Sequence, residues 1–165
     1  MSKIEKVEYS HYAEWLSGQR WSYWCTFTTK YELTVKSARR LMDRFHSRNN
    51  KTIPTTMFWV VEQFKSKAGC HVHALLRVEA DLPKNAVWQA LFENYQTVSG
   101  SKKEINNNRV MFKTFNRVKF AEYQPEKSLE CAKYCCKYVM KEQNKRQAEF
   151  DIYLPHSIQN FNIQK

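Results

Sequence analysis

The stretch "TTMFWVVEQFKSKAGCHVHALLRVE" (residues 55–79) contains two largely apolar runs separated by a short polar segment. Residues 55–64 and 70–79 each have the length and composition of a β-strand. Two such runs joined by a short loop, here "KSKAG", predict a β-hairpin. We therefore expect residues 55–79 to form an antiparallel pair of strands.

Extended and helical patterns alternate on both sides of this hairpin. Residues 21–31 are rich in aromatic and β-branched residues, which favours a strand. Residues 34–49 carry apolar side chains at helical spacing behind Thr34, a good N-cap residue. The other expected elements are a helix opened by Pro83, a polar loop over 97–108, strands over 109–115 and 117–123 that could pair with each other, and a final helix from about Glu126 to Lys145.

This order of elements favours an α+β fold with a central antiparallel sheet of ferredoxin-like or RRM-like type and flanking helices. We expect the helices to be segregated to one face of the sheet. Residues 1–146 are expected to form one domain, and residues 147–165 a C-terminal tail without a clear pattern.

The composition points to a polyanionic partner. Lysine and arginine number 27 against 16 acidic residues, which gives a net charge of +11 and favours nucleic acid over a membrane. No stretch approaches the roughly 20 apolar residues of a transmembrane helix, and the N-terminus has no apolar run typical of a signal peptide. These features, and the odd number of cysteines, predict a cytoplasmic protein. No C-x-x-C pair is present, so buried thiols are favoured over a zinc site.

Two histidines stand two residues apart in "CHVHALL". Because side chains alternate along a strand, His71 and His73 project from one face, with their Cα atoms roughly 7 Å apart. Glu62 closes the preceding strand, and the hairpin would bring its carboxylate across from the imidazoles. Two unrelated histidines and an ordinary strand-end charge are the alternative interpretation. As a group, the three side chains predict a site for Mg²⁺ or Mn²⁺ with open positions for a phosphate oxygen.

The expected final helix carries a polar stripe within "ECAKYCCKYVMK" (residues 130–141). At about 100° per residue, five polar residues fall within an arc of roughly 100°, and apolar residues occupy a separate arc that can pack on the sheet. The five are Glu130, Tyr134, Lys137, Tyr138 and Lys141. A solvated lysine face edged by tyrosines is the alternative interpretation.

Three motifs, in this order, resemble those of HUH endonucleases, the nicking and joining domains of rolling-circle replication initiators (Rep proteins) of plasmids and phages. The segment "CTFTT" is similar to the first motif, "HVH" to the histidine motif, and "YCCKYVMK" to the tyrosine motif. Together they span roughly residues 21–141, most of the chain. Nothing in the chain resembles the helicase domain of some eukaryotic viral Reps, which favours a bacterial or phage source.

The resemblance implies that His71 and His73 bind a divalent metal ion, Mn²⁺ or Mg²⁺, with Glu62 as the third ligand. It also implies that Tyr134 is the nucleophile and that Lys137 is the lysine of the tyrosine motif.

The resemblance leaves two schemes open. In phage initiators with two tyrosines four residues apart both can attack, which would give Tyr138 a role. In one plasmid group a glutamate four residues before the nucleophile activates water, which would give Glu130 a role. Lys137 and Lys141 would add positive potential near the reacting phosphate.

The implied function is that of a metal-dependent, sequence-specific single-stranded DNA endonuclease and strand transferase. It would nick and rejoin DNA through a 5′-phosphotyrosine intermediate and so initiate rolling-circle replication. The expected partners are single-stranded or hairpin origin DNA and the host helicase and polymerase. Trp21, Tyr23 and Trp24 could stack on unpaired bases, although at least half of these aromatic residues are expected in the core.

Two alternatives to this function stay open. The nearest is a relaxase or a transposase of the same superfamily. A different class is a non-catalytic, RRM-like nucleic-acid-binding domain, although the aromatic signature of such domains is absent.

Overall fold

The computed structural model describes residues 11, 13–29, 31–100, 103–106, 109–112, 118–122, 128–143 and 149–154. Its elements are β1 (Tyr23–Phe27), α2 (Val35–Thr52), β2 (Thr55–Gln63), β3 (Cys70–Val78), α3 (Lys84–Ser99), β4 (Lys103–Asn106), β5 (Arg109–Phe112), β6 (Val118–Glu122), α4 (Ser128–Gln143) and β7 (Phe150–Tyr153). A short helical segment over residues 13–17 precedes β1. The fold is α+β, as predicted.

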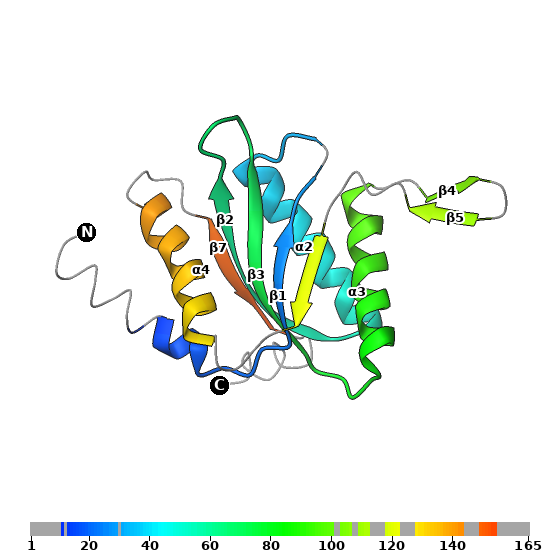
Figure 1. Cartoon of the computed structure of the whole chain (residues 1–165), viewed down its shortest axis with the longest axis horizontal. Helices are drawn as coiled ribbons and strands as arrows, with labels where there is room; N and C mark the ends of the chain where they lie inside the picture. Colours follow the sequence, from blue (N-terminus) through cyan, green and yellow to red (C-terminus); the bar gives the residue numbers. More distant parts are fainter. Residues whose placement is uncertain are drawn as a thin grey trace, which may run out of the picture.

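Five strands form a sheet in the order β6-β1-β3-β2-β7, and every neighbouring pair is antiparallel. The predicted hairpin is present as β2 and β3, in a register that sets Glu62 opposite His71. Gly69 ends the connecting loop with a φ of 93°, a conformation that glycine adopts without steric cost. The hairpin therefore lies inside the sheet, with β1 and β7 on its two sides (Figure 1).

The expected pairing of residues 109–115 with 117–123 is wrong. Instead, β5 pairs with β4 in a separate two-stranded sheet, and β6 pairs with β1 at the edge of the large sheet. The expected loop over 97–108 contains the end of α3 and all of β4. Polar residues such as those of β4 are weak strand formers, so their pairing depends on the neighbouring strand more than on local preference.

Part of the expected C-terminal tail (residues 147–165) belongs to the large sheet. Strand β7 pairs with residues 57–60 of β2, and the N–H of Val61 donates to the carbonyl of Glu149 at 2.9 Å. Arg39 of α2 forms ion pairs with Glu149 and, at 2.8 Å, with Asp151. The sheet thus continues to Tyr153, beyond the boundary expected from the sequence.

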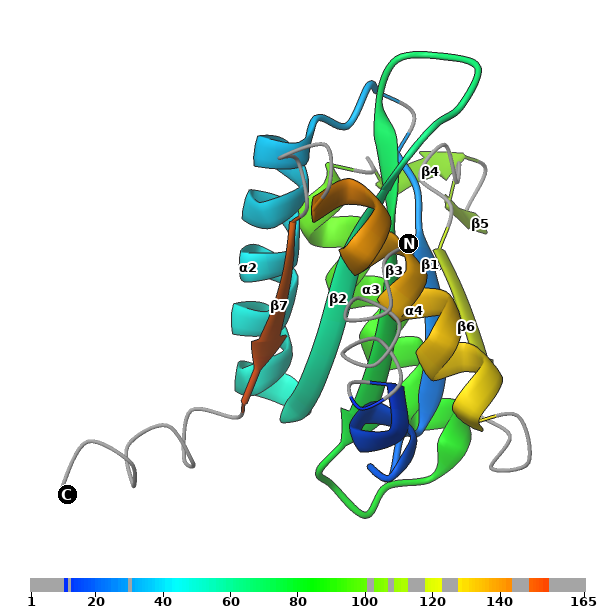
Figure 2. The same cartoon turned by 90° about the vertical axis from the view of Figure 1, so that its left-hand side faces the viewer.

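Helices cover both faces of the sheet rather than one. On one face α2 and α3 pack on alternate sheet residues that include Phe27, Trp59 and Leu76. On the other, α4 and the segment 13–17 pack on a second set that includes Phe58 and Leu75, and Figure 2 shows α4 across the sheet from α2. The continuous apolar run of β2 is typical of a strand buried on both faces.

None of the helices within the described ranges is long and apolar enough to cross a membrane.

Candidate metal centre and adjoining tyrosine

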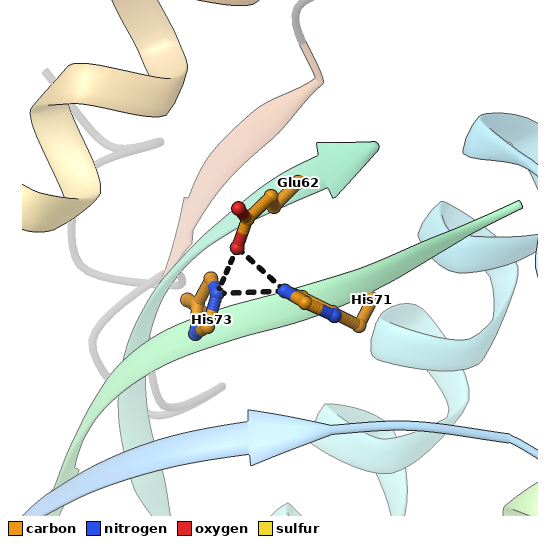
Figure 3. A group of neighbouring side chains, drawn as sticks. All are labelled: Glu62, His71 and His73. Atoms are coloured by element: carbon orange, nitrogen blue, oxygen red, sulfur yellow. Dashed lines mark hydrogen bonds and ion pairs between the residues drawn. The ribbon is translucent and has the colours of Figure 1, made fainter. Parts of the chain in front are cut away.

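Glu62, His71 and His73 meet on the α4 side of the sheet (Figure 3). Strand alternation and the β2–β3 register bring them together: His71 lies opposite Glu62, and His73 follows two residues later on the same face. Oε2 of Glu62 lies 2.5 Å from Nε2 of His71 and 2.6 Å from Nε2 of His73, and the two nitrogens are 2.9 Å apart. The predicted convergence of these three side chains is present.

The spacing of these atoms fits three neighbouring ligands of one small cation. Ligands about 2.1 Å from an octahedral ion are roughly 3.0 Å apart when adjacent, so the three atoms need to separate by only about 0.1–0.5 Å. Two imidazole nitrogens and one carboxylate oxygen form a donor set that binds divalent ions and leaves positions open. The side chains are largely buried, with exposed fractions of 14% for Glu62, 20% for His71 and 7% for His73. Within the part of the chain that the structure describes, this is the only such group of histidine, cysteine and acidic side chains.

Residues of β1 hold the ring of His73. Oγ1 of Thr26 lies 3.3 Å from Nδ1 of His73 on the far side of the ring from Glu62. The indole of Trp24 stacks on the same imidazole, with centroids 5.6 Å apart and planes 13° apart. When Nδ1 carries the proton and donates to Thr26, the Nε2 lone pair points at the site, which is the tautomer that a metal ligand requires.

Burial of His73 favours the same protonation state. Desolvation by burial and the nearby His71 lower the pKa of His73 below its ordinary value, and the hydrogen bond and charge of Glu62 only partly oppose them. A lowered pKa keeps the imidazole neutral at pH 7, as metal binding requires.

The β2–β3 loop brings a cation close to the triad. The ring of Phe64 meets the imidazole of His71 edge-on, with centroids 5.0 Å apart. The ammonium group of Lys67 lies 4.3 Å from the centroid of the Phe64 ring. The exposed positive charge of Lys67 is thus separated from the candidate ligand His71 by one side chain, that of Phe64.

Helix α4 carries Tyr134 to the triad. The Tyr134 hydroxyl donates a long hydrogen bond of 3.5 Å to Oε2 of Glu62, the oxygen that both histidines also contact. The ring meets His73 edge-on at 5.0 Å and Trp24 edge-on at 5.6 Å. The side chain is nevertheless 39% exposed, so a ligand can reach it from solvent. The buried face of α4 includes Ala132, Cys135 and Cys136, and these side chains pack the helix on the sheet.

The other members of the predicted stripe divide into two groups. Glu130 and Lys137 are exposed on α4 on either side of Tyr134. Tyr138 and Lys141 belong to the same helix, but their side chains lie outside the described residues. The structure therefore brings Tyr134 of the stripe into contact with the triad.

Thr26 and Trp24 are site residues whose roles the sequence did not reveal. Both lie in β1, in or beside the "CTFTT" motif, and the signal was available: residues 24 and 26 alternate with the core residues of that strand. The other two aromatic residues considered for base stacking are elsewhere. Trp21 is buried and Tyr23 packs against the core on the α2–α3 face.

The cysteines are buried thiols, as expected. Cys25, Cys70, Cys135 and Cys136 are buried and Cys131 is partly exposed, and no disulfide joins any of the five. Burial raises the pKa of both Cys70 and Cys136 to about 12, which opposes thiolate formation.

Comparison of the chain with protein-family models, with curated proteins and with solved structures finds no match in any of the three.

Proposed function

We propose that this chain is a metal-dependent, single-stranded DNA endonuclease and strand transferase that nicks and rejoins DNA through a tyrosine-linked intermediate to initiate rolling-circle replication. The observation that carries the proposal is the position of the Tyr134 hydroxyl, 3.5 Å from the carboxylate oxygen that both histidines contact. A divalent cation and a nucleophile that share one oxygen neighbour would act on the same phosphate.

Glu62, His71 and His73 would hold Mn²⁺ or Mg²⁺ through Oε2 and the two Nε2 atoms. A bound cation of this kind polarises a scissile phosphate and offsets the charge that builds on its oxygens.

In the proposed step Oη of Tyr134 attacks the phosphorus of the scissile phosphodiester. The new bond joins phosphorus to Oη, and the bond from phosphorus to the 3′-oxygen breaks. The hydroxyl proton of Tyr134 passes to solvent and the departing 3′-oxygen takes up a proton, so the step is balanced. Because one phosphodiester replaces another, a later 3′-hydroxyl can reverse the reaction and rejoin the strand without ATP. Meanwhile the free 3′-hydroxyl is a primer that a polymerase can extend.

Positive charge near the site supports a DNA substrate. Lys137 stands one turn after Tyr134 on α4, and Lys67 lies over the ring of Phe64, which contacts His71. Both lysines are exposed and belong to a chain of net charge +11. Such charges attract a nucleic acid backbone and would stabilise the crowded negative charge of the transition state.

The topology is consistent with the proposed family. Elements β1, α2, β2, β3, α3 and β6 follow the β-α-β-β-α-β order of a ferredoxin-like unit, with the strand order β6-β1-β3-β2. Helix α4 then carries the proposed nucleophile over the face that α2 and α3 leave uncovered.

The packing disfavours the RRM-like alternative. RRM domains stack bases on aromatic residues of an open sheet face. Here Phe58, Val60 and Leu75 are buried beneath α4 and the segment 13–17, on the face opposite α2 and α3. Neither described face of the sheet offers such a platform.

The proposal is tested with degenerate single-stranded oligonucleotides labelled at either end. After incubation with Mn²⁺ and denaturation, a 3′-label should remain on the protein, because the 5′-phosphate of the downstream fragment is joined to tyrosine. A 5′-label should be released. Mass spectrometry of the adduct should locate the nucleotide on Tyr134. Transfer of the 5′-label to the protein, or no covalent product with either pool, would contradict the proposed chemistry.

A further inference from the structure

A cavity of about 490 Å³ lies at the end of the sheet remote from the β2–β3 loop. The start of β1, the end of β3 and the beginning of α3 surround it. Figure 1 shows these segments at the bottom of the view. Its lining includes Trp21, Tyr23, Leu82, Lys84, Asn85 and Trp88. None of these residues belongs to the metal centre or contacts Tyr134 in the interactions described above.

Hydrogen bonds fix the residues of the inner wall of the cavity. Trp21 is 8% exposed, and its indole N–H donates to the carbonyl of Leu16 at 2.7 Å. Ser22 is bound to β3 twice: its N–H donates to the carbonyl of Leu76 at 2.8 Å, and its Oγ accepts from the N–H of Val78 at 3.0 Å. The space is therefore preformed, as ligand pockets usually are.

The outer wall exposes apolar surface. Trp88 and Leu82 are each 47% exposed. The indole of Trp88 stacks on Phe92 one turn later, with centroids 5.1 Å apart and planes 8° apart, which holds the ring in a defined plane. Large exposed apolar side chains grouped around a cavity are typical of a binding site.

We infer that this cavity binds an unpaired base of the DNA strand on which Tyr134 acts. Aromatic walls accept the flat face of a base, and base–aromatic stacking tolerates any sequence. The amide of Asn85 can bond to a base edge, and the ammonium group of Lys84 suits an adjoining phosphate. This inference rests on the proposed function, because the occupant is the substrate strand.

The separation of the two sites sets the position of the captured base. Five residues of β3 run from His73 to Val78, or roughly 17 Å along the strand. At the spacing of stacked nucleotides this is about five nucleotides from the reacting phosphate, and the path from the α4 side of the sheet to the α3 side adds to that number. The cavity would thus grip the strand while the phosphate lies at the triad.

The experiment measures binding of labelled oligonucleotides to Tyr134→Phe protein by fluorescence anisotropy, so that cleavage does not interfere. The added substitution Trp88→Ala should weaken binding by about five-fold or more, and Trp88→Phe should restore most of it. Trp15→Ala is the matched control, because Trp15 is also 47% exposed but lies in the segment 13–17. It should leave the affinity unchanged.

A series of oligonucleotides with one abasic position each tests the occupant. Loss of the base at one position of the oligonucleotide should weaken binding to the Tyr134→Phe protein by a similar factor. The same abasic oligonucleotide should bind the Tyr134→Phe, Trp88→Ala protein no more weakly than the intact oligonucleotide does. Equal losses from Trp15→Ala and Trp88→Ala, no loss from Trp88→Ala, or no binding of single strands at all would overturn the inference. Adduct formation by the wild-type chain is scored separately. If the wild type forms the adduct but Trp88→Ala does not change the affinity, only the proposed role of the cavity is wrong. If Trp88→Ala weakens binding but no adduct forms, the proposed chemistry is wrong.

Discussion

The hydroxyl of Tyr134 lies 3.5 Å from Oε2 of Glu62, although 72 residues separate the two along the chain. The carboxylate belongs to the central hairpin and the hydroxyl to a helix that packs on the sheet afterwards. Because His71 and His73 contact the same oxygen, the helix and the hairpin together form one site.

Tyr134→Phe should reduce covalent adduct formation more than about a thousandfold in single-turnover assays, since it removes the attacking oxygen. The side chain is 39% exposed and the ring is kept, so the free energy of unfolding should change by less than about 0.5 kcal/mol. Tyr31→Phe, at a tyrosine that is 46% exposed and distant in sequence, is the control and should remain active. Tyr138→Phe should leave the first cleavage largely intact. An adduct found on Tyr138 alone would show that the nucleophile is misassigned.

Glu62→Gln should weaken Mn²⁺ binding at least about tenfold, because the amide keeps the shape of the side chain but removes the only negative charge of the triad. Mn²⁺ should raise the melting temperature of the wild type through selective binding to the folded state, and should do so much less for the variant. Glu79→Gln is the control, since Glu79 pairs with Arg77 on the same sheet, away from the triad. An equal Mn²⁺-induced shift in Glu62→Gln and wild type would argue against a metal site here.

Thr26→Val should lower Mn²⁺ affinity about tenfold while leaving the fold intact, because it removes the hydrogen-bond partner of Nδ1 of His73 at almost constant volume. Thr26→Ser keeps the hydroxyl and should restore the affinity. Isothermal titration of both variants checks this. Weak binding in both would mean that packing at this position, and not the hydrogen bond alone, sets the affinity.

Arg39→Ala should destabilise the protein by about 1–2 kcal/mol in urea unfolding. Arg39 pairs with Glu149 and Asp151 and lies over the ring of Trp59 at 5.1 Å, so its removal loosens β7. The neighbouring and more exposed Arg40 provides the control, and Arg40→Ala should stay within about 0.5 kcal/mol. A loss from Arg39→Ala as small as that expected for Arg40→Ala would mean that the contacts of Arg39 with β7 contribute little.

Cys131 should be the thiol that iodoacetamide modifies in the folded protein at pH 8. The reagent attacks thiolates, and a pKa raised to about 12 keeps Cys70 and Cys136 protonated until far above that pH. Cys25 and Cys135 are fully buried and have pKa values raised by desolvation. Peptide mapping should find all five thiols modified only after denaturation. Rapid modification of Cys70 in the native state would show that the start of β3 opens.

Local pattern was enough to predict the hairpin and the convergence of Glu62, His71 and His73. Strand alternation sets His71 and His73 on one face, and a short loop limits how far β2 can shift against β3, so Glu62 falls opposite His71. Helical periodicity likewise separated the buried face of α4 from the stripe that contains Tyr134. Each of these relationships spans few residues, and short-range geometry determines it.

Only the tertiary structure decided which strands pair and which helices pack on each face of the sheet. Strand β7 has four residues and no distinctive pattern. Its place depends on β2 and on Arg39, and Arg39 is more than a hundred positions away from β7 in the chain. The pairing of β6 with β1, the covering of both sheet faces and the meeting of Tyr134 with Glu62 are of the same kind. Such contacts join segments whose local preferences are equally compatible with other partners. The choice among partners is made by the burial and hydrogen bonding of the assembled chain, which no single segment encodes.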